Sequence, residues 1–166
     1  GAKIKFLNVK KFNNEKVGDI YIKSSSLKPI RAEKKYYLNT TDEYPILFVM
    51  SALIGGVSSF SGISDLKNKE SDRILQMQKI LNQIGIHSKF TKDKLEIKGK
   101  NIHKIPKRMI RVANLGDHRI CMSAAILGLL TGSEVRIKNF ETVGTSSPNF
   151  LKIVKQLGGS FEKKNL

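Results

Sequence analysis

Residues 42–74 read DEYPILFVMSALIGGVSSFSGISDLKNKESDRI, and this stretch decides the fold class. Its apolar part, residues 44–54, is long enough for a helix, and the early Pro45 suits a first helical turn. The glycine pair that follows predicts the end of this buried helix. Because residues 57–63 then have the composition of a short strand, the stretch predicts helices packed against a sheet.

A second, amphipathic helix is predicted over residues 72–84, with Ser71 or Asp72 as its N-cap and Gly85 as its stop. One face carries apolar side chains at helical spacing: Ile74, Met77, Leu81 and Ile84. Two strands follow, over residues 86–90 and 94–97. For the apolar helix over residues 44–54, Thr41 and Asp42 are the N-cap candidates.

The same plan returns near 75 residues later, counted from Asp42 to Asp117. An apolar helix over residues 118–130 follows Asp117 as its N-cap, Thr131-Gly132 ends it, and residues 135–140 alternate like a strand. Ser147-Pro148 then opens an amphipathic helix that Gly158-Gly159 stops, and Phe161 is expected to start a last strand. Each unit is βαβ-like, so the sequence contains an internal repeat.

Upstream of these units, residues 3–10 and 17–23 alternate apolar and polar side chains and predict a β-hairpin. We therefore divide the chain into the hairpin of a preceding unit at about residues 1–30, one repeat unit at 31–100 and a second at 101–166. The fold class is α/β (α+β), built from repeated units.

Composition narrows the function further. The 166 residues carry a formal net charge of +16, which fits nucleic acid, an acidic membrane surface or anionic small substrates as partners. Aromatic residues make up only 7% and the basic residues are scattered, so we do not expect nucleic-acid binding. A/T-rich codon bias is an alternative source of much of the lysine. We interpret the remaining charge as a preference for anions.

Other classes are excluded by what the sequence lacks. No apolar run reaches the roughly 18 residues of a membrane span. The single cysteine, Cys121, excludes an internal disulfide, and the spacing of His, Asp and Glu suits no metal site, so we expect neither metal nor cofactor and a cytoplasmic location. The chain begins at Gly1 without Met, so we expect it to be cut from something longer.

Charged residues gather where three helices are predicted to begin. They are Asp42 before the first helix, Lys69, Glu70 and Arg73 at the second, and Asp117, His118 and Arg119 at the third. Helix N-termini favour anions, and arginine adds bidentate geometry. The plainer alternative is that the aspartates only cap helices and that residues 67–73 are a solvated surface. Arg119 begins an almost wholly apolar helix, so it needs a partner, either a bound anion or Asp117.

These residues carry a family resemblance. KESDR at 69–73, inside the stretch 42–74, and GDHRICMSAAILGL at 116–129 resemble the "KESDR" and "DHR-x-x-M" motifs of the EPSP synthase family. VGTSSPNFLKIVKQLGG at 143–159 resembles the closing helix of that family, and the opening hairpin is similar to that of its class II branch. The resemblance implies two domains of three βαβαββ units each, the inside-out α/β barrel of the enolpyruvyl transferase fold, of which this chain covers part of one.

The resemblance also implies a reaction and its residues. Phosphoenolpyruvate gives its carboxyvinyl group to the 5-hydroxyl of shikimate 3-phosphate, within chorismate and aromatic amino acid biosynthesis. Asp42 is the implied general base and substrate ligand, Lys69 the proton donor and Glu70 the proton shuttle. Substrate binding is implied for Asp42 and Lys69, and also for Arg73, His118, Arg119 and Thr145.

Two positions depart from the family pattern. Lys67 stands where an arginine is usual, which keeps the positive charge but loses the bidentate geometry of the guanidinium group. Thr145 stands where many members have lysine, and threonine is typical of class II. The other domain is absent, so we expect a fragment that is inactive alone and needs the missing N-terminal domain in cis or trans. The alternatives are a basic RNA- or anion-binding module, or a relative of the UDP-N-acetylglucosamine enolpyruvyl transferase.

Overall fold

The computed structural model describes residues 1–113 and 115–162. Within these ranges the strands form a two-stranded hairpin, a four-stranded sheet in the order β3-β4-β6-β5, and a two-stranded parallel pair. The strands are β1 (Lys3–Phe12), β2 (Glu15–Lys23), β3 (Arg31–Ala32), β4 (Gly56–Ser61), β5 (His87–Thr91), β6 (Lys94–Gly99), β7 (Ile110–Val112) and β8 (Val135–Ile137).

Helices and 3-10 turns connect these strands. The α-helices are α1 (Tyr37–Thr40), α2 (Tyr44–Ala52), α3 (Arg73–Gln83), α4 (His118–Thr131) and α5 (Phe150–Gln156). The 3-10 turns are η1 (Lys34–Tyr36), η2 (Thr41–Glu43), η3 (Ser64–Asn68), η4 (Ile102–Lys104) and η5 (Phe140–Thr145). The predicted order of elements is thereby confirmed for the hairpin, for the first unit and for the second unit as far as α5, whereas β3, α1, η4 and β7 were not predicted.

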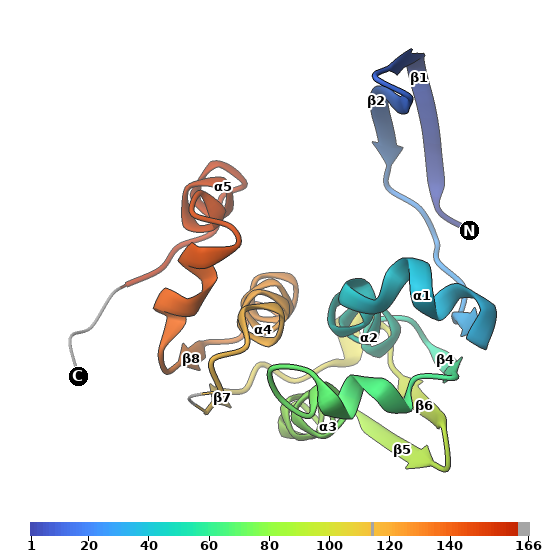
Figure 1. Cartoon of the computed structure of the whole chain (residues 1–166). Coiled ribbons are helices and arrows are strands. Elements are labelled where there is room, and N and C mark those ends of the chain that lie inside the picture. The colour runs from blue at the N-terminus through green and yellow to red at the C-terminus, as the bar shows by residue number, and fades with distance from the viewer. Residues whose placement is uncertain (114, 163–166) are drawn as a thin grey trace.

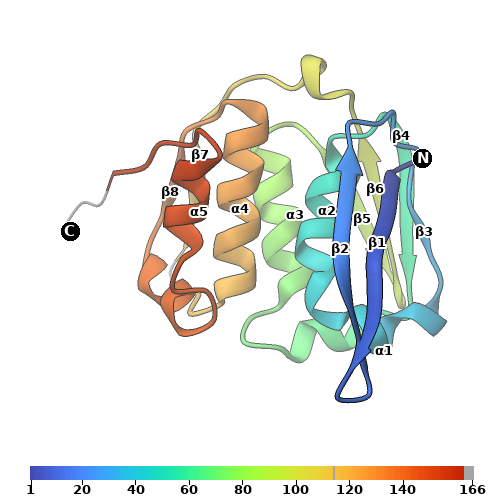
Figure 2. The ribbon, with the colours of Figure 1, turned by 90° about the horizontal axis from the view of Figure 1, so that it is seen from above.

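Helices α2, α3 and α4 lie side by side, and α2 and α3 cover one face of the four-stranded sheet (Figure 2). The core between them contains fully buried aromatic rings of Tyr44, Phe48 and Phe60, with the Phe48 and Phe60 centroids 5.0 Å apart in an edge-on arrangement. The apolar face predicted for α3 is buried, as Ile74, Met77 and Leu81 show. This packing holds the N-termini of the three helices in one region.

The helix ends agree in part with the predicted caps. Asp72 and Asp117 cap α3 and α4 through their carboxylates, and Gly85 and Gly132 follow these helices with positive φ, all as predicted. The prediction that Thr41 or Asp42 caps α2 is wrong, because the N-cap position is occupied by Glu43 and no side chain caps it.

The alternative caps have other partners. The Thr41 hydroxyl donates to the Tyr37 carbonyl and the Asp42 carboxylate accepts from arginines. Ser71 does not cap α3, because its hydroxyl donates to Asp117 instead.

Two strand predictions also need correction. The strand expected over residues 135–140 ends at Ile137, because Asn139 takes a left-handed φ of +56° and η5 begins at Phe140. Phe161 begins no strand as far as Glu162, and residues 163–166, where the rest of that strand was expected, lie outside the described residues.

The β1–β2 hairpin stands apart from the body of the molecule (Figure 1). One of its faces is apolar, because Ile4 pairs with Ile22 and Phe6 pairs with Ile20 across the strands. These side chains are 48 to 71% exposed. Such a face is stable only when another apolar surface covers it.

Candidate active site

Three helix N-termini meet at one cluster of charged side chains, which we call the carboxylate–guanidinium cluster. Asp42 precedes α2, Glu70 and Arg73 lie at the start of α3, and Asp117 and Arg119 lie at the start of α4. Since helix N-termini present N–H groups and the positive end of the helix dipole, their convergence favours negative charge at this position.

Arg73 is the centre of the cluster and is only 1% exposed. Its Nε donates to Asp117 Oδ2 at 3.1 Å, its Nη1 to Asp42 Oδ1 at 3.1 Å and its Nη2 to Glu70 Oε2 at 2.6 Å. Burial alone lowers the pKa of the guanidinium, but hydrogen bonding and charge from Asp117, Asp42 and Glu70 outweigh it and raise the pKa. Arg73 is therefore a fixed cation that ties all three helix starts together.

Asp117 is completely buried and links α3 to α4. One carboxylate oxygen accepts the backbone N–H groups of Arg119 and Ile120, at 3.0 and 3.3 Å, as the N-cap of α4. The other oxygen accepts from Arg73 and from the Ser71 hydroxyl, which is 2.8 Å away. A buried carboxylate with four donors is satisfied, and it orients its neighbours.

Arg119 spans the two halves of the chain. Its Nη2 donates to Asp42 Oδ2 at 3.0 Å, and its Nη1 lies 3.4 Å from the Asp42 carbonyl oxygen and 3.5 Å from Glu43 Oε1. Two partners were expected for the Arg119 guanidinium, a bound anion or Asp117. The prediction of Asp117 is wrong, because its carboxylate pairs with Arg73 and accepts from Arg119 only through the backbone N–H.

The Nε of Arg119 is buried and has no hydrogen-bond partner among the described residues. An unmet donor of this kind costs about 1–3 kcal/mol, so the guanidinium has capacity for a further acceptor.

Asp42 accepts from both arginines, and this decides its protonation. Partial burial raises the pKa of its carboxyl, but the hydrogen bond from Arg73 and the charges of Arg119, Arg73 and Lys69 together hold the pKa below 3.8. Asp42 is thus ionised at neutral pH and is a weak base while both arginines remain in contact. Any ligand that draws an arginine away raises the basicity of Asp42.

Lys69 lies beside the cluster but pairs with a residue that the sequence did not single out. Its Nζ is 2.9 Å from Asp65 Oδ2, and the Tyr37 hydroxyl donates to the same oxygen at 2.9 Å. Burial and the bond to Asp65 raise the pKa of Tyr37 to about 12, so Tyr37 stays a donor. The spacing of four residues between Asp65 and Lys69 is the signal that could have indicated this pair.

The structure does not bring every predicted site residue into the cluster. Thr145 is exposed, and its hydroxyl donates to the carbonyl oxygen of Thr142 at 2.8 Å. His118 is partly buried at the start of α4, and its ring has no hydrogen bond within residues 1–113 and 115–162. Lys67 lies over the Phe90 ring, with Nζ 4.4 Å from the centroid, as a cation–π contact.

Metal binding and membrane insertion are the two remaining points for the part of the chain that the structure describes. In that part of the chain, no three or more His, Cys, Asp and Glu side chains are placed to hold a metal ion. None of its helices combines the length and the apolar character that crossing a membrane requires.

The α/β architecture is that of part of an enolpyruvyl transferase domain, as comparison with solved structures shows. The chain is similar to solved structures of the EPSP synthase from Acinetobacter baumannii, one with a TM-score of 0.86 at 31% identity over 99% of this chain and 37% of that one. The enolpyruvyl transferase NikO from Streptomyces tendae matches with a TM-score of 0.55 at 13% identity over 93% of this chain and 33% of that one, which shows the fold alone.

Sequence comparison identifies the family. The pattern of EPSP synthase (3-phosphoshikimate 1-carboxyvinyltransferase) matches residues 3–154, and the chain belongs to this family. It is 35% identical to the enzyme of that name from Zymomonas mobilis over 98% of this chain, and 36% identical to that from Petrotoga mobilis over 95%. In both cases it spans only 36% of the relative, so the chain corresponds to part of a domain.

Proposed function

We propose that this chain supplies one wall of the active site of a 3-phosphoshikimate 1-carboxyvinyltransferase. The reaction moves the carboxyvinyl group of phosphoenolpyruvate to the 5-hydroxyl of shikimate 3-phosphate and releases phosphate. The observation that carries the proposal is the convergence of Arg73 and Arg119 on the Asp42 carboxylate, at 3.1 and 3.0 Å. Two guanidinium groups that hold a carboxylate in this way suit the carboxylate and phosphate of phosphoenolpyruvate.

Each residue of the cluster has a role in this proposal. The hydroxyl oxygen of shikimate 3-phosphate forms a bond to C2 of phosphoenolpyruvate while its proton passes to Asp42. Lys69 donates a proton to C3, which gives a tetrahedral adduct. The bond from C2 to the phosphate oxygen then breaks, phosphate leaves with the electron pair, and Glu70 removes a proton from C3 to restore the double bond.

The remaining residues bind. Arg73 and Arg119 hold the anionic groups of phosphoenolpyruvate, and the uncommitted Arg119 Nε supports this role. In this proposal His118 and Thr145 complete the substrate contacts. Both would reach the substrate only when it is bound or when the rest of the enzyme is present. Asp117 holds Arg73 and the start of α4 in place.

The rest of the site comes from a segment in cis or a second chain. The chain spans 36% of its relatives, and the apolar face of the β1–β2 hairpin, with Phe6 at 71% exposure, is a surface that such a segment would cover. We also propose that residues 1–30 end a preceding unit and that 31–100 and 101–166 are two repeat units. A cytoplasmic location fits the single cysteine, Cys121, which is buried as a free thiol.

The test is a phosphate-release assay with both substrates, using this chain with and without the N-terminal portion of a related EPSP synthase. We expect no turnover by the chain alone, because positioning by the missing part contributes about 10⁵-fold or more. We expect turnover after complementation, and none when the chain carries Arg119→Gln. Turnover by the chain alone contradicts the need for a second part, and its absence in every combination contradicts the proposed activity.

A further inference from the structure

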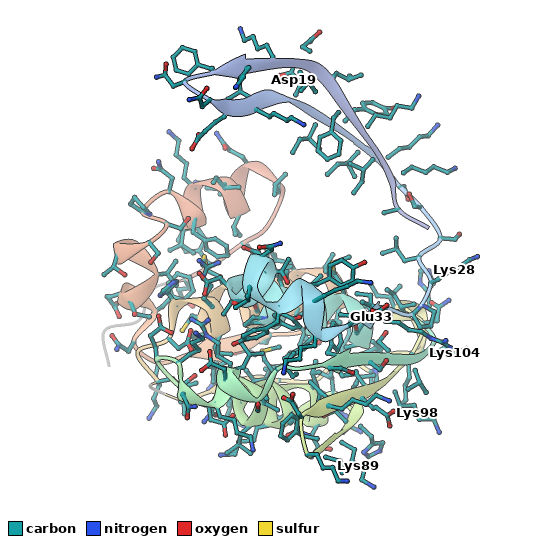
Figure 3. The ribbon with its side chains drawn as sticks, turned by 45° about the vertical axis from the view of Figure 1, so that its right-hand side comes forward. Asp19, Lys28, Glu33, Lys89, Lys98 and Lys104 are labelled. Carbon is teal, nitrogen blue, oxygen red and sulfur yellow. The ribbon has the colours of Figure 1, made fainter. Side chains whose placement is uncertain are left out.

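A basic site, separate from the cluster, lies at one end of the four-stranded sheet, where β4 ends and β5 turns into β6. It is a surface cavity of about 500 Å³ that is widely open to solvent, and none of the residues of the carboxylate–guanidinium cluster lines it. Four lysines contribute to its wall: Lys34, Lys89, Lys92 and Lys94. Lys89 points away from the body of the molecule on the β5 side (Figure 3).

Two carboxylates also line the cavity, and both have partners. Glu96 Oε1 lies 2.6 Å from Lys94 Nζ, and that bond together with the charges of Lys94 and Lys89 lowers its pKa. Asp93 Oδ1 accepts the Ser64 backbone N–H at 2.6 Å, which fixes the turn to the start of η3. Four lysines against two carboxylates leave the cavity with a net charge of +2.

Three of the lysines make no ion pair within residues 1–113 and 115–162, namely Lys34, Lys89 and Lys92. Lys34 and Lys89 are still attracted by Asp93 and Glu96, whose pKa values their charges help to lower, but the four lysines outnumber these two carboxylates. The excess positive charge favours a bound anion. The backbone accepts a cost at Lys92, whose φ is +58°. Every other non-glycine residue with positive φ in the described part of the chain is asparagine, which tolerates that conformation better.

Gly62 allows Lys34 to approach the cavity. It has a φ of +75°, and a Cβ at this position would overlap the Lys34 side chain. The absence of that Cβ lets η1 pack against the end of β4, so that Lys34 faces the β5–β6 turn. The cavity therefore depends on a close approach that only glycine permits.

The chemistry of the walls indicates the ligand. The basic residues of the lining are all lysines, which act as point charges and bind phosphate well. No aromatic side chain lines the cavity, so it offers no surface on which a base could stack. Its volume lies within the range of about 300–1,000 Å³ that small-molecule sites occupy.

We propose that this cavity binds a small polyphosphate-type anion, one with two or more phosphoryl groups in a row. The site shares no residue with the proposed active site and does not rest on its activity. The Asp93 carboxylate, which lines the cavity, accepts the Ser64 N–H and so joins the β5–β6 turn to the start of η3, the 3-10 turn that precedes Lys69.

The test is calorimetric titration of the full chain with inorganic tripolyphosphate in about 50 mM and 150 mM salt, which changes screening moderately. We expect one saturable site, and affinity about five- to tenfold weaker in the double variant Lys89→Gln, Lys92→Gln, since each lost charge contact near the surface is worth a few-fold. Lys152→Gln, Lys155→Gln on α5 is the matched control, because it removes the same charge from exposed positions and should leave the affinity unchanged.

Three results overturn the proposal. The first is the absence of saturable binding, and the second is an equal loss of affinity in the two double variants. The third is single-stranded RNA that binds more tightly than tripolyphosphate and is weakened as much as tripolyphosphate by the Lys89 and Lys92 changes. The last result would indicate a nucleic-acid surface. Since all variants are exposed lysine replacements and no substrate of the transferase is added, failure of this proposal and failure of the proposed function are separate outcomes.

Discussion

Replacing Asp42 with asparagine should strengthen the binding of phosphoenolpyruvate to this chain, although Asp42 is the proposed general base. In the structure its carboxylate occupies the donors of Arg73 and Arg119 at 3.1 and 3.0 Å, so an incoming anion has to compete with it. The Asp42 side chain is 53% exposed, and contacts of this kind are worth about 0.2–1 kcal/mol each. Removal of both should therefore increase affinity about two- to thirtyfold.

The measurement is calorimetric titration with phosphoenolpyruvate at pH 7, with Lys89→Gln and Lys92→Gln present in every protein so that the lysine cavity does not contribute. Asp19→Asn is the matched control, because it removes the same charge from an exposed position on the remote hairpin, labelled in Figure 3. It should change affinity by less than about twofold, since surface charges beyond the Debye length are screened. Equal or weaker binding by Asp42→Asn would refute the idea that the carboxylate stands in for a ligand.

Three other outcomes follow from the cluster. Asp117→Asn should lower the free energy of unfolding by about 3–5 kcal/mol in urea titration, because it leaves Arg73 buried beside an uncharged group. The control Asp72→Asn keeps a cap on α3 and should lower the free energy of unfolding by less than about 1 kcal/mol. Arg119→Lys should weaken phosphoenolpyruvate binding about five- to tenfold with the charge retained, because a lysine cannot form the two-pronged contact; an unchanged affinity contradicts this role. The pKa of Asp42 is lower in the folded state, so its contribution to stability is complete above its ordinary pKa of 3.8. That contribution is lost as the pH falls through the lower folded-state pKa. The thermal unfolding midpoint of the parent chain should therefore approach that of Asp42→Asn in acid.

The sequence predicted the parts of this fold that depend on local pattern. The apolar stretch before Gly55, the amphipathic face of α3 and the alternation in β1 and β2 are local signals, and the structure confirms them. The short strands β3 and β7 were not predicted, because their two or three residues are fixed by pairing with β4 and β8 from elsewhere in the chain. Pairing across long distances leaves no periodicity in so few residues.

The candidate site shows the same limit in its contacts. Spacing placed Arg73, Asp117 and Arg119 at helix starts, but it did not show which carboxylate would meet which arginine. Those partners lie 31 to 77 positions apart for the Asp42 contacts and 44 for Arg73 with Asp117. The packing angle of α2, α3 and α4 decides them, and it follows from the whole core. The cap prediction for Asp42 was wrong for this reason: a tertiary contact with two arginines outweighs a local bond to its own helix.

The net charge of the chain and the charge of its site have opposite signs. The ion pairs at and beside the cluster join three cations, Lys69, Arg73 and Arg119, to five carboxylates, Asp42, Glu43, Asp65, Glu70 and Asp117. The excess of +16 therefore resides elsewhere, and it is no measure of how strongly this site attracts anions. In such a site, an anionic substrate gains contacts with the arginines mainly by displacing carboxylates. The displaced Asp42 then loses the charges that lower its pKa and becomes a stronger base. In the proposed reaction, binding of the anion would therefore itself prepare Asp42 for its proposed role as the general base.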